Sequence, residues 1–515
     1  MTPATTGGGA PAAATTPPGA FRQRALFAVL GAASVAAAVI GQGNLAVALA
    51  PLGAVVGVLA LYKAPLRATM VATAFMMLIS DPPGAGPAGR LWFPPSFLVG
   101  KFMGDNLNNA TGIRALGFSG CDLMTGVMTA LLLWRWATNQ RIDPRPSPTP
   151  RELKVAALIS LAAWLVMWAW GLARGGDFRQ SLWQVQKPLY LPLQFFLIQS
   201  IGDGKRELKT YGWVLAAAAF EKGFQAIWFR LFVDPSYDTS ATATNHSDSI
   251  LFAATFVMII ALNVEKRDRR SAVYAALGLP ILAWAMVANN RRLAWVEIGL
   301  SLALIYAITP WSSFKRRLAR AAVIAAPIAL LYVAAGWNSS GRIFKPVQMI
   351  QSVVSAEKDR STLDREVEND NLLFTMFEHQ PFGTGWGHEY HEVIVGDDIS
   401  QAFPQYKYLP HNSVLGFFVF GGPLGFAGIM SLFAAGVFFA TRAYRAALRP
   451  GQRAAALSCL GIYAIFLMQG WGDLGMQSWV ALFTLAPTLV ASGRLALDVG
   501  AWPAPAARPR AVRGR

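Results

Sequence analysis

The sequence has little charge and few cysteines or histidines. Charged residues make up 14% of the 515 residues, whereas a soluble globular chain carries about 25%. The two cysteines, Cys121 and Cys459, both lie in apolar stretches and offer neither a disulfide framework nor the spacing of a zinc site. Only five residues are histidines. These shortages argue against a soluble globular protein, a disulfide scaffold and a cysteine-ligated zinc centre.

Long apolar blocks take the place of the missing charge. Hydrophobic residues make up 54% of the chain, and they are gathered in runs such as LAVALAPLGAVVGVLALY (45–62) and ARAAVIAAPIALLYVAAGW (319–337). A bilayer requires about 20 such residues per helix. The sequence therefore predicts an all-α integral membrane protein with about 12–14 transmembrane helices. The candidate blocks are 25–42, 45–62, 66–80, 119–137, 154–173, 182–202, 209–232, 248–264, 272–289, 292–310, 319–336, 412–440, 454–471 and 475–492.

The net charge of +17 is distributed in short clusters between the apolar blocks. The clusters include KRELK (205–209), EKRDRR (265–270), FKRRLAR (314–320) and TRAYRAALRPGQR (441–453). Short basic loops between spans are typical of the cytoplasmic side of a membrane protein. The pattern predicts contact with anionic lipid headgroups and argues against a nucleic-acid partner.

The alternation of blocks and clusters divides the chain into five parts. We expect a disordered cytoplasmic tail (1–22), N-terminal transmembrane helices (23–336), a large periplasmic loop (337–411), C-terminal transmembrane helices (412–495) and a basic cytoplasmic tail (496–515). The first segment is rich in alanine, glycine, proline and threonine and lacks the features of a signal peptide. Within block 412–440, Gly421-Gly422-Pro423 is expected to break the helix.

Two polar features fall on the non-cytoplasmic side of this topology. One is the tight turn ANNRRLAW (288–295), in which Arg291 and Arg292 interrupt apolar sequence. The other is the long loop, which ends in His411 and Asn412 at the edge of the next span. Arginines at a span edge either snorkel to the headgroups or meet an anionic partner. A histidine there either caps its helix or performs chemistry at the membrane surface.

Three segments in this order carry a family resemblance. ANNRRLAWVEIGLSLAL (288–304) resembles the arginine-containing helix start of the O-antigen ligase and O-antigen/exopolysaccharide polymerase family. NLLFTMFEHQPFGTGWGHEYH (371–391) resembles the large-loop segment of that family, with its proline followed by Gly-x-Gly-x-Gly. PHNSVLGFFVFGGPLG (410–425) resembles its closing His-Asn-x-x-Leu motif. Here Arg291 precedes Arg292, so the register of the first motif is ambiguous, and Arg292 aligns better.

The resemblance implies an activity and a location. Members of the family are bacterial membrane glycosyltransferases that transfer a glycan from undecaprenyl diphosphate to an acceptor glycan or glycolipid. The active site faces the periplasm from the inner membrane, and no cofactor is implied. We expect a polymerase of lipid-linked repeat units in O-antigen or exopolysaccharide biosynthesis, with a ligase acting on lipid A core as the alternative. Such an enzyme implies membrane lipids, a flippase and a chain-length regulator as partners.

The chemistry of such a transfer assigns roles to particular residues. Arginine binds phosphate through a bidentate fork, so Arg292 is the first candidate and Arg291 the second for the diphosphate, with Arg365 as a further clamp. His411 is the candidate general base for the acceptor hydroxyl. Asn412 is either a helix cap, which we favour, or a sugar contact. Lys187 and Arg230, at apolar blocks, are further candidates to line the diphosphate site.

Two other classes of function remain as alternatives. His379, His388 and His391 lie in one loop region, and GHEYHE (387–392) superficially resembles a metalloprotease motif. A zinc hydrolase requires histidines four residues apart on one helix, whereas these are three apart and follow glycines, so we predict no metal site. A lipid-linked-glycan flippase would also have many spans and basic cavity residues, but it would not need the long loop that ends in His411-Asn412.

Overall fold

The computed structural model describes residues 20–40, 51–52, 55, 66–80, 97–111, 117–138, 148–201, 205–233, 243–311, 313–339, 344, 347, 351, 360–401 and 403–503. In these segments the structure is helical, and the one β pairing is an isolated bridge between Asn106 and Ser119. The first half contains α1 (Ala20–Ile40), α3 (Leu66–Leu78), α4 (Phe97–Met103), α5 (Leu107–Thr111), α6 (Gly120–Ala137), α7 (Arg151–Ala173), α8 (Phe178–Ile201) and α9 (Lys205–Trp228). The second half contains α10 (Asp248–Lys266), α11 (Arg269–Asn289), α12 (Arg292–Ile308), α13 (Ser313–Gly336), α15 (Arg360–Glu378), α16 (Ser413–Ala446), α17 (Pro450–Gly472) and α18 (Trp479–Asp498).

The helices confirm the predicted all-α membrane class. Six of those described are long and apolar enough to cross a membrane, namely α7, α10, α11, α16, α17 and α18. The predicted block 45–62 lies largely outside the described residues. Each other predicted block coincides with a helix, although the ends differ by several residues. The predicted tail 1–22 also lies outside the described residues except for its last three, where α1 begins.

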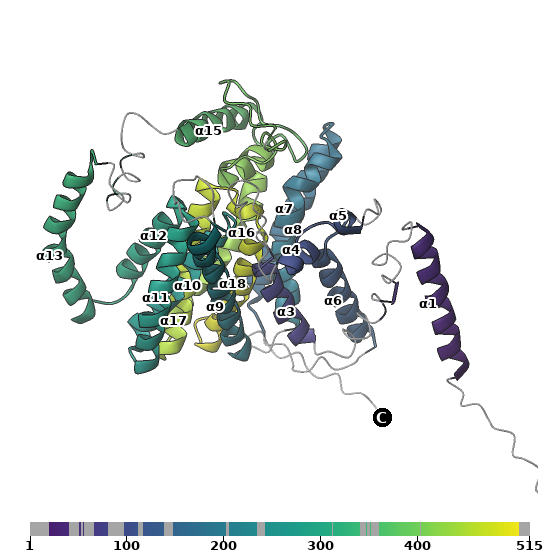
Figure 1. The fold of residues 1–515 in the computed structure, drawn as a ribbon, viewed down its shortest axis with the longest axis horizontal. Coiled ribbons are helices and arrows are strands. Elements are labelled where there is room, and N and C mark those ends of the chain that lie inside the picture. Colours follow the sequence, from purple (N-terminus) through teal and green to yellow (C-terminus); the bar gives the residue numbers. More distant parts are fainter. Residues whose placement is uncertain are drawn as a thin grey trace, which may run out of the picture.

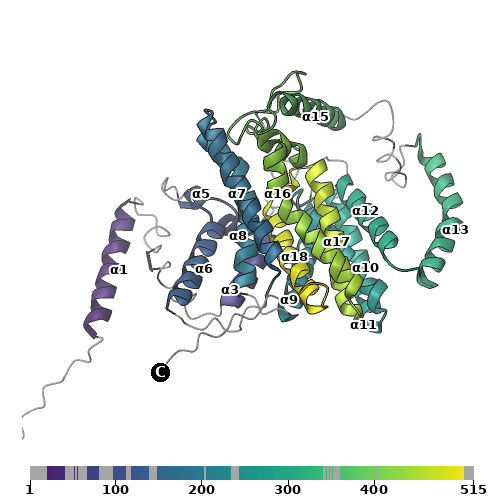
Figure 2. The same cartoon turned by 180° about the vertical axis from the view of Figure 1, so that it is seen from behind.

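The centre of the molecule is a bundle in which α18 is enclosed by its neighbours (Figure 1). Nearly all of the apolar side chains of α18 are buried, among them Leu482, Phe483 and Leu489. A helix that is apolar on all sides requires such a position. Helices α1 and α13 stand apart from this bundle when it is seen from either side (Figures 1 and 2).

Helix α16 is kinked where the sequence predicted a break. Gly422 has φ 61° and ψ −177° inside the helix, and Pro423 follows it. A Cβ at position 422 would lie 2.1 Å from the main-chain oxygen of Pro381. Glycine is required because the residue is left-handed and because another segment of backbone packs directly on it. The main chain of the loop before α16, at Pro381 to Gly383, therefore packs directly against the kink.

Two of the basic clusters, 265–270 and 441–453, lie at the end of the bundle opposite His411. Arg453, at the start of α17, pairs with Glu265, at the end of α10, at 2.8 Å. Tyr444, near the end of α16, donates to the same carboxylate at 2.8 Å. His411 precedes the start of α16, which is one helix length away. The structure thus separates the predicted basic end from the end that carries the candidate catalytic residues.

The region 337–411, which we predicted as a polar loop, contains the helix α15. Its buried positions, Glu368, Asn371, Leu372 and Thr375, recur every three or four residues and form one helix face. The sequence interpretation overlooked this period because several of these positions are polar. Helix α15 packs against α16 and lies across the end of the bundle at which α16 begins (Figure 1).

The glycine-rich part of the same region anchors it to the bundle. Thr384 and Gly385 donate main-chain hydrogen bonds to Val419 and Phe420 of α16, at 3.1 and 2.9 Å. Gly385 has φ 82°, and a Cβ there would lie 2.3 Å from the Cα of Gly171 in α7. The next residue, Trp386, is buried. The Gly-x-Gly-x-Gly segment therefore has an architectural role, which is to hold the loop between α7 and α16.

Candidate functional site

The candidate site lies at the end of the bundle that α15 covers. Arg291 stands at the start of α12, His411 precedes α16, and Asp473 terminates α17. Arg365 and Glu368, one helical turn apart on α15, face the same region. Four separate segments thus contribute polar side chains to one place.

His411 is held by a carboxylate of α15. The main-chain nitrogen of His411 donates to both oxygens of Glu368, at 3.1 and 3.2 Å, and its Nδ1 lies 3.3 Å from each of them. The Glu368 side chain is 9% exposed and that of His411 is 29% exposed. Burial opposes charge on the imidazole, but the hydrogen bond and the charge of Glu368 outweigh it and raise the pKa of His411. With Nδ1 directed at Glu368, Nε2 is left to meet a substrate proton.

Asn412 is a helix cap, as favoured from the sequence. It is the N-cap residue of α16, and its Oδ1 accepts the main-chain N–H of Leu415 at 3.0 Å. Its Nδ2 donates to Oδ1 of Asn369 on α15 at 3.1 Å. Asn412 therefore stabilises the start of α16 and also ties that start to α15, immediately beside the His411–Glu368 pair.

Arg291 interacts electrostatically with one carboxylate, Asp473, and with one other guanidinium group, Arg365. Burial lowers the pKa of Arg291 to about 10, the charge of Asp473 opposes that shift, and the charge of Arg365 adds to it. Its Nε is buried and has no hydrogen-bond partner. Arg291 thus feels the charges of one guanidinium group and one carboxylate, and its unpartnered Nε can still bind an anion.

Asp473 is the carboxylate shared by this cluster. Burial opposes its ionisation, but His246, Arg365 and the main-chain N–H of Leu474 favour the charged form and lower its pKa to about 2. Arg365 in turn donates from Nη1 to the main-chain oxygen of Gly472, the last residue of α17. Asp473 is therefore a buried anion that interacts with basic side chains from several segments.

The other predicted phosphate ligands occupy different surroundings. Arg292, our first choice, is exposed at the first position of α12, whereas Arg291 faces Asp473 and Arg365. Arg230 is 1% exposed and donates from Nε to the main-chain oxygen of Ala288 at 2.8 Å. Lys187 lies over the ring of Trp479, 5.8 Å from its centroid. Of the basic residues proposed from the sequence, Arg291 and Arg365 are close enough to interact electrostatically.

Two of the loop histidines, His379 and His391, lie edge to face with their ring centroids 5.2 Å apart, whereas His388 lies elsewhere. His388 contacts the main-chain oxygen of Gly171 through Nε2 at 3.0 Å. His391 pairs with Glu378 at 2.6 Å, and His379 contacts the main-chain oxygen of Thr375 at 3.1 Å. In the part of the chain that the structure describes, no three metal-ligating side chains come together.

Three members of the cluster were missed from the sequence. Glu368 lies in a stretch of mixed charges, Asp473 lies in the short turn between the last two spans, and His246 lies far from the family motifs. An acidic residue three positions after Arg365, on the same helix face, was a usable signal for Glu368. The pairing of His246 with Asp473, at 3.8 Å, depends on tertiary structure alone.

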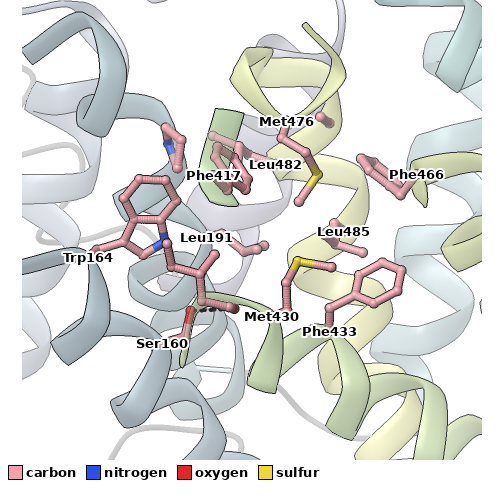
Figure 3. Close-up of a pocket in the computed structure, with 13 residues that line it drawn as sticks. Ser160, Trp164, Leu191, Phe417, Met430, Phe433, Phe466, Met476, Leu482 and Leu485 are labelled. Carbon is pink, nitrogen blue, oxygen red and sulfur yellow. Dashed lines mark hydrogen bonds between the residues drawn. The ribbon is translucent and has the colours of Figure 1, made fainter. Parts of the chain in front are cut away.

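A cavity between α7, α16, α17 and α18 belongs to the apolar core. It has a volume of about 20 Å³ and is lined by side chains such as Trp164, Phe417, Phe466 and Met476 (Figure 3). Ser160 supplies a hydroxyl at its edge, but that hydroxyl donates to the main-chain oxygen of Ile429 at 3.1 Å. A space of this size holds about one water molecule. The polar cluster on α12, α15, α16 and α17 is therefore the better candidate for chemistry.

Comparison with known families places most of this cluster within one domain. Residues 277–430 match the family model described as O-antigen ligase. The match includes all three motifs and confirms the resemblance that they carried. It supports an O-antigen ligase- or polymerase-type function and, together with the helices of membrane-spanning length, a multi-pass membrane protein. A comparison with curated proteins gave no match.

Proposed function

We propose, from the O-antigen ligase domain at residues 277–430, that this protein polymerises lipid-linked polysaccharide repeat units. In this proposal a glycan leaves undecaprenyl diphosphate and joins the hydroxyl of another lipid-linked repeat. The observation that carries the proposal is the meeting of a guanidinium pair, Arg291 and Arg365, with the His411–Glu368 pair at one end of the bundle. The guanidinium pair is suited to bind a diphosphate, and the His411–Glu368 pair is suited to accept the proton of a hydroxyl.

The guanidinium pair is suited to the donor and to the leaving group. The buried Nε of Arg291 has no partner, and the charge of Arg365 disfavours its ionisation. A diphosphate placed between the two side chains would relieve the repulsion and accept their N–H groups. Since negative charge on the diphosphate grows as the glycosidic bond breaks, these contacts strengthen toward the transition state. The arginines therefore supply the neutralisation that a metal ion supplies in other transferases.

The His411–Glu368 pair is suited to activate the acceptor. The acceptor hydroxyl gives its proton to Nε2 of His411 as its oxygen forms a bond with the anomeric carbon. The bond between that carbon and the phosphate oxygen breaks, and its electron pair leaves with the diphosphate. Glu368 accepts the hydrogen bond from Nδ1 and stabilises the imidazolium that forms. Every atom and charge of the step is accounted for by these groups.

The proposal places the site at the periplasmic face of the bacterial inner membrane. It rests on the separation of the clusters 265–270 and 441–453 from His411, since basic loops favour the cytoplasmic side. Cysteine substitutions in 389–401 should be labelled from outside the inner membrane, and substitutions in 265–270 only after permeabilisation. Labelling of both segments from the same side contradicts this placement.

The function is tested by assaying purified protein with lipid-linked repeat units as the sole substrate. A ladder of longer lipid-linked glycans supports polymerisation. Transfer that occurs only after lipid A core is added supports the ligase alternative. A lipid that changes leaflet in proteoliposomes without forming a new glycosidic bond supports the flippase alternative and contradicts glycosyl transfer.

A further inference from the structure

A second histidine–carboxylate pair borders the candidate site. His246, in the segment that leads into α10, has its Nδ1 3.8 Å from Oδ2 of Asp473. The His246 side chain is 53% exposed, whereas that of Asp473 is 13% exposed. One nitrogen of the ring therefore faces a buried carboxylate, while the rest of the ring is open to a ligand. His246 lies outside the family match, which begins at residue 277.

The backbone on the N-terminal side of His246 is held by a buried amide. Asn289, at the end of α11, is 1% exposed. Its Oδ1 accepts from the main-chain N–H and the hydroxyl of Thr244, at 2.9 and 3.1 Å, and its Nδ2 donates to the main-chain oxygen of Asn245 at 3.3 Å. Asn289 thus connects the His246 segment to the turn that carries Arg291.

The backbone on the C-terminal side is held by a buried ion pair. Asp248 accepts from the main-chain N–H of Asn245 at 3.1 Å and pairs with Lys222 of α9 at 3.6 Å. Both side chains of the ion pair are fully buried. Buried charges are retained only where partners satisfy them, and they fix geometry more than they add stability. Two buried polar groups therefore fix the position of a half-exposed imidazole.

His246 joins the cluster through Asp473, whose main-chain oxygen also accepts from the hydroxyl of Ser413, two residues after His411. His411 contacts Glu368; one turn earlier on α15, Arg365 contacts the end of α17, where Asp473 in turn contacts His246. In a single displacement at the anomeric carbon, the attacking hydroxyl and its base lie on the face opposite the leaving group. If His411 marks the side of the base, the basic side chains gathered around Asp473, which are Arg291, Arg365 and His246, are left for the leaving group.

We propose that His246, oriented by Asp473, binds the phosphate of the lipid diphosphate that is farther from the sugar, while Arg291 and Arg365 bind the nearer one. The inference rests on the proposed function. The imidazole of His246 faces Asp473 through Nδ1 and can donate from Nε2 to a phosphate oxygen. The donor site thereby distinguishes a polyprenyl diphosphate from a polyprenyl monophosphate.

The test compares the binding of these two lipids in nanodiscs. The wild-type protein should bind a polyprenyl diphosphate more tightly than the monophosphate of the same chain length. His246→Ala should weaken diphosphate binding by about tenfold or more, the usual effect of losing a charge-assisted hydrogen bond. The same variant should leave monophosphate binding unchanged. His246→Gln, which keeps a neutral donor, should show a smaller loss and also serves if the alanine variant fails to fold.

A matched control is available in His391, which pairs with Glu378 at 2.6 Å and has a side chain 55% exposed. His391→Ala should leave both affinities unchanged. If the His246 variants retain the wild-type preference for diphosphate, or lose both lipids equally, His246 does not bind the distal phosphate. If the wild-type protein binds neither lipid, the proposed function itself is wrong, so the two failures are distinguishable.

Discussion

Glu368 of α15 binds His411 at two points, the main-chain N–H and the imidazole Nδ1. A long loop is thereby joined to the start of α16 through the side chain proposed as the base. A carboxylate in this position selects the tautomer that leaves Nε2 free to accept a proton, and it stabilises the imidazolium once the proton has arrived.

Replacing Glu368 should change how the rate depends on pH. Burial lowers the pKa of His411, but Glu368 raises it by more, so the net shift is upward. A general base works in its neutral form, so the rate should rise as pH increases through the raised pKa of His411. In Glu368→Gln the anion is lost, the pKa of His411 falls, and the inflection should move to lower pH. The maximal rate should fall by about tenfold or more because the tautomer is no longer held. A pH–rate profile under single-turnover conditions measures both effects, and an inflection that stays in place argues against this pairing.

Arg291 and Arg292 should differ in their effect on donor binding. Arg291→Lys keeps the charge but loses the fork beside Arg365, so the affinity for the lipid diphosphate and the turnover should both fall, by about tenfold or more. Arg292→Lys alters an exposed side chain at the helix start and should change the affinity by less than about twofold. Binding titrations of the two variants provide the comparison. If Arg292→Lys weakened binding more than Arg291→Lys, Arg292 would be the phosphate ligand, as the family resemblance favoured.

Asn412 should contribute to stability more than to chemistry. Asn412→Ala removes the cap of α16 and should lower the free energy of unfolding by about 1 kcal/mol. Turnover per folded molecule should change much less than in a His411 variant. Thermal melts and rate measurements on the same preparation separate the two quantities. A large loss of turnover with an unchanged melting temperature would indicate that Asn412 contacts the sugar.

Chelation should leave the reaction intact. Arg291 and Arg365 are assigned the charge of the leaving group, so exhaustive treatment with EDTA should not lower the rate of transfer. The control is a metal-dependent transferase treated in parallel. If EDTA abolished activity and zinc restored it, the histidines of the loop, His379, His388 and His391, would have to be reconsidered as ligands.

Much of the fold was predictable because membrane helices have a strong local signal. Blocks such as 154–173 and 454–471 coincide with α7 and α17, and the break at Gly422 follows from glycine and proline chemistry. Helix α15 was missed because its buried face includes Glu368, Asn371 and Thr375, which no apolar period reveals. These polar residues are buried because they bind neighbouring loop segments, as Asn371 does with the main chain of Val393 and Ile394.

The candidate site was predictable only in part, for a similar reason. The sequence alone identified His411, Arg291 and Arg365 as candidates, because they belong to segments that resemble family motifs or that precede one. Their partners Glu368 and Asp473 act through proximity, which depends on how α15 and α17 meet the start of α16. The choice between Arg291 and Arg292 also depended on packing, since adjacent residues at a helix start face different directions.

The central claim is that His411 takes the proton of the acceptor hydroxyl, and single-turnover transfer by His411→Ala in nanodiscs tests it most directly. The variant should fold, bind the lipid diphosphate donor nearly as well as the wild-type protein, and transfer glycan about 10²–10⁴-fold more slowly, the usual contribution of a positioned general base. If a folded His411→Ala protein transfers glycan at the wild-type rate, His411 is a structural partner of Glu368 and the assignment of the base is wrong.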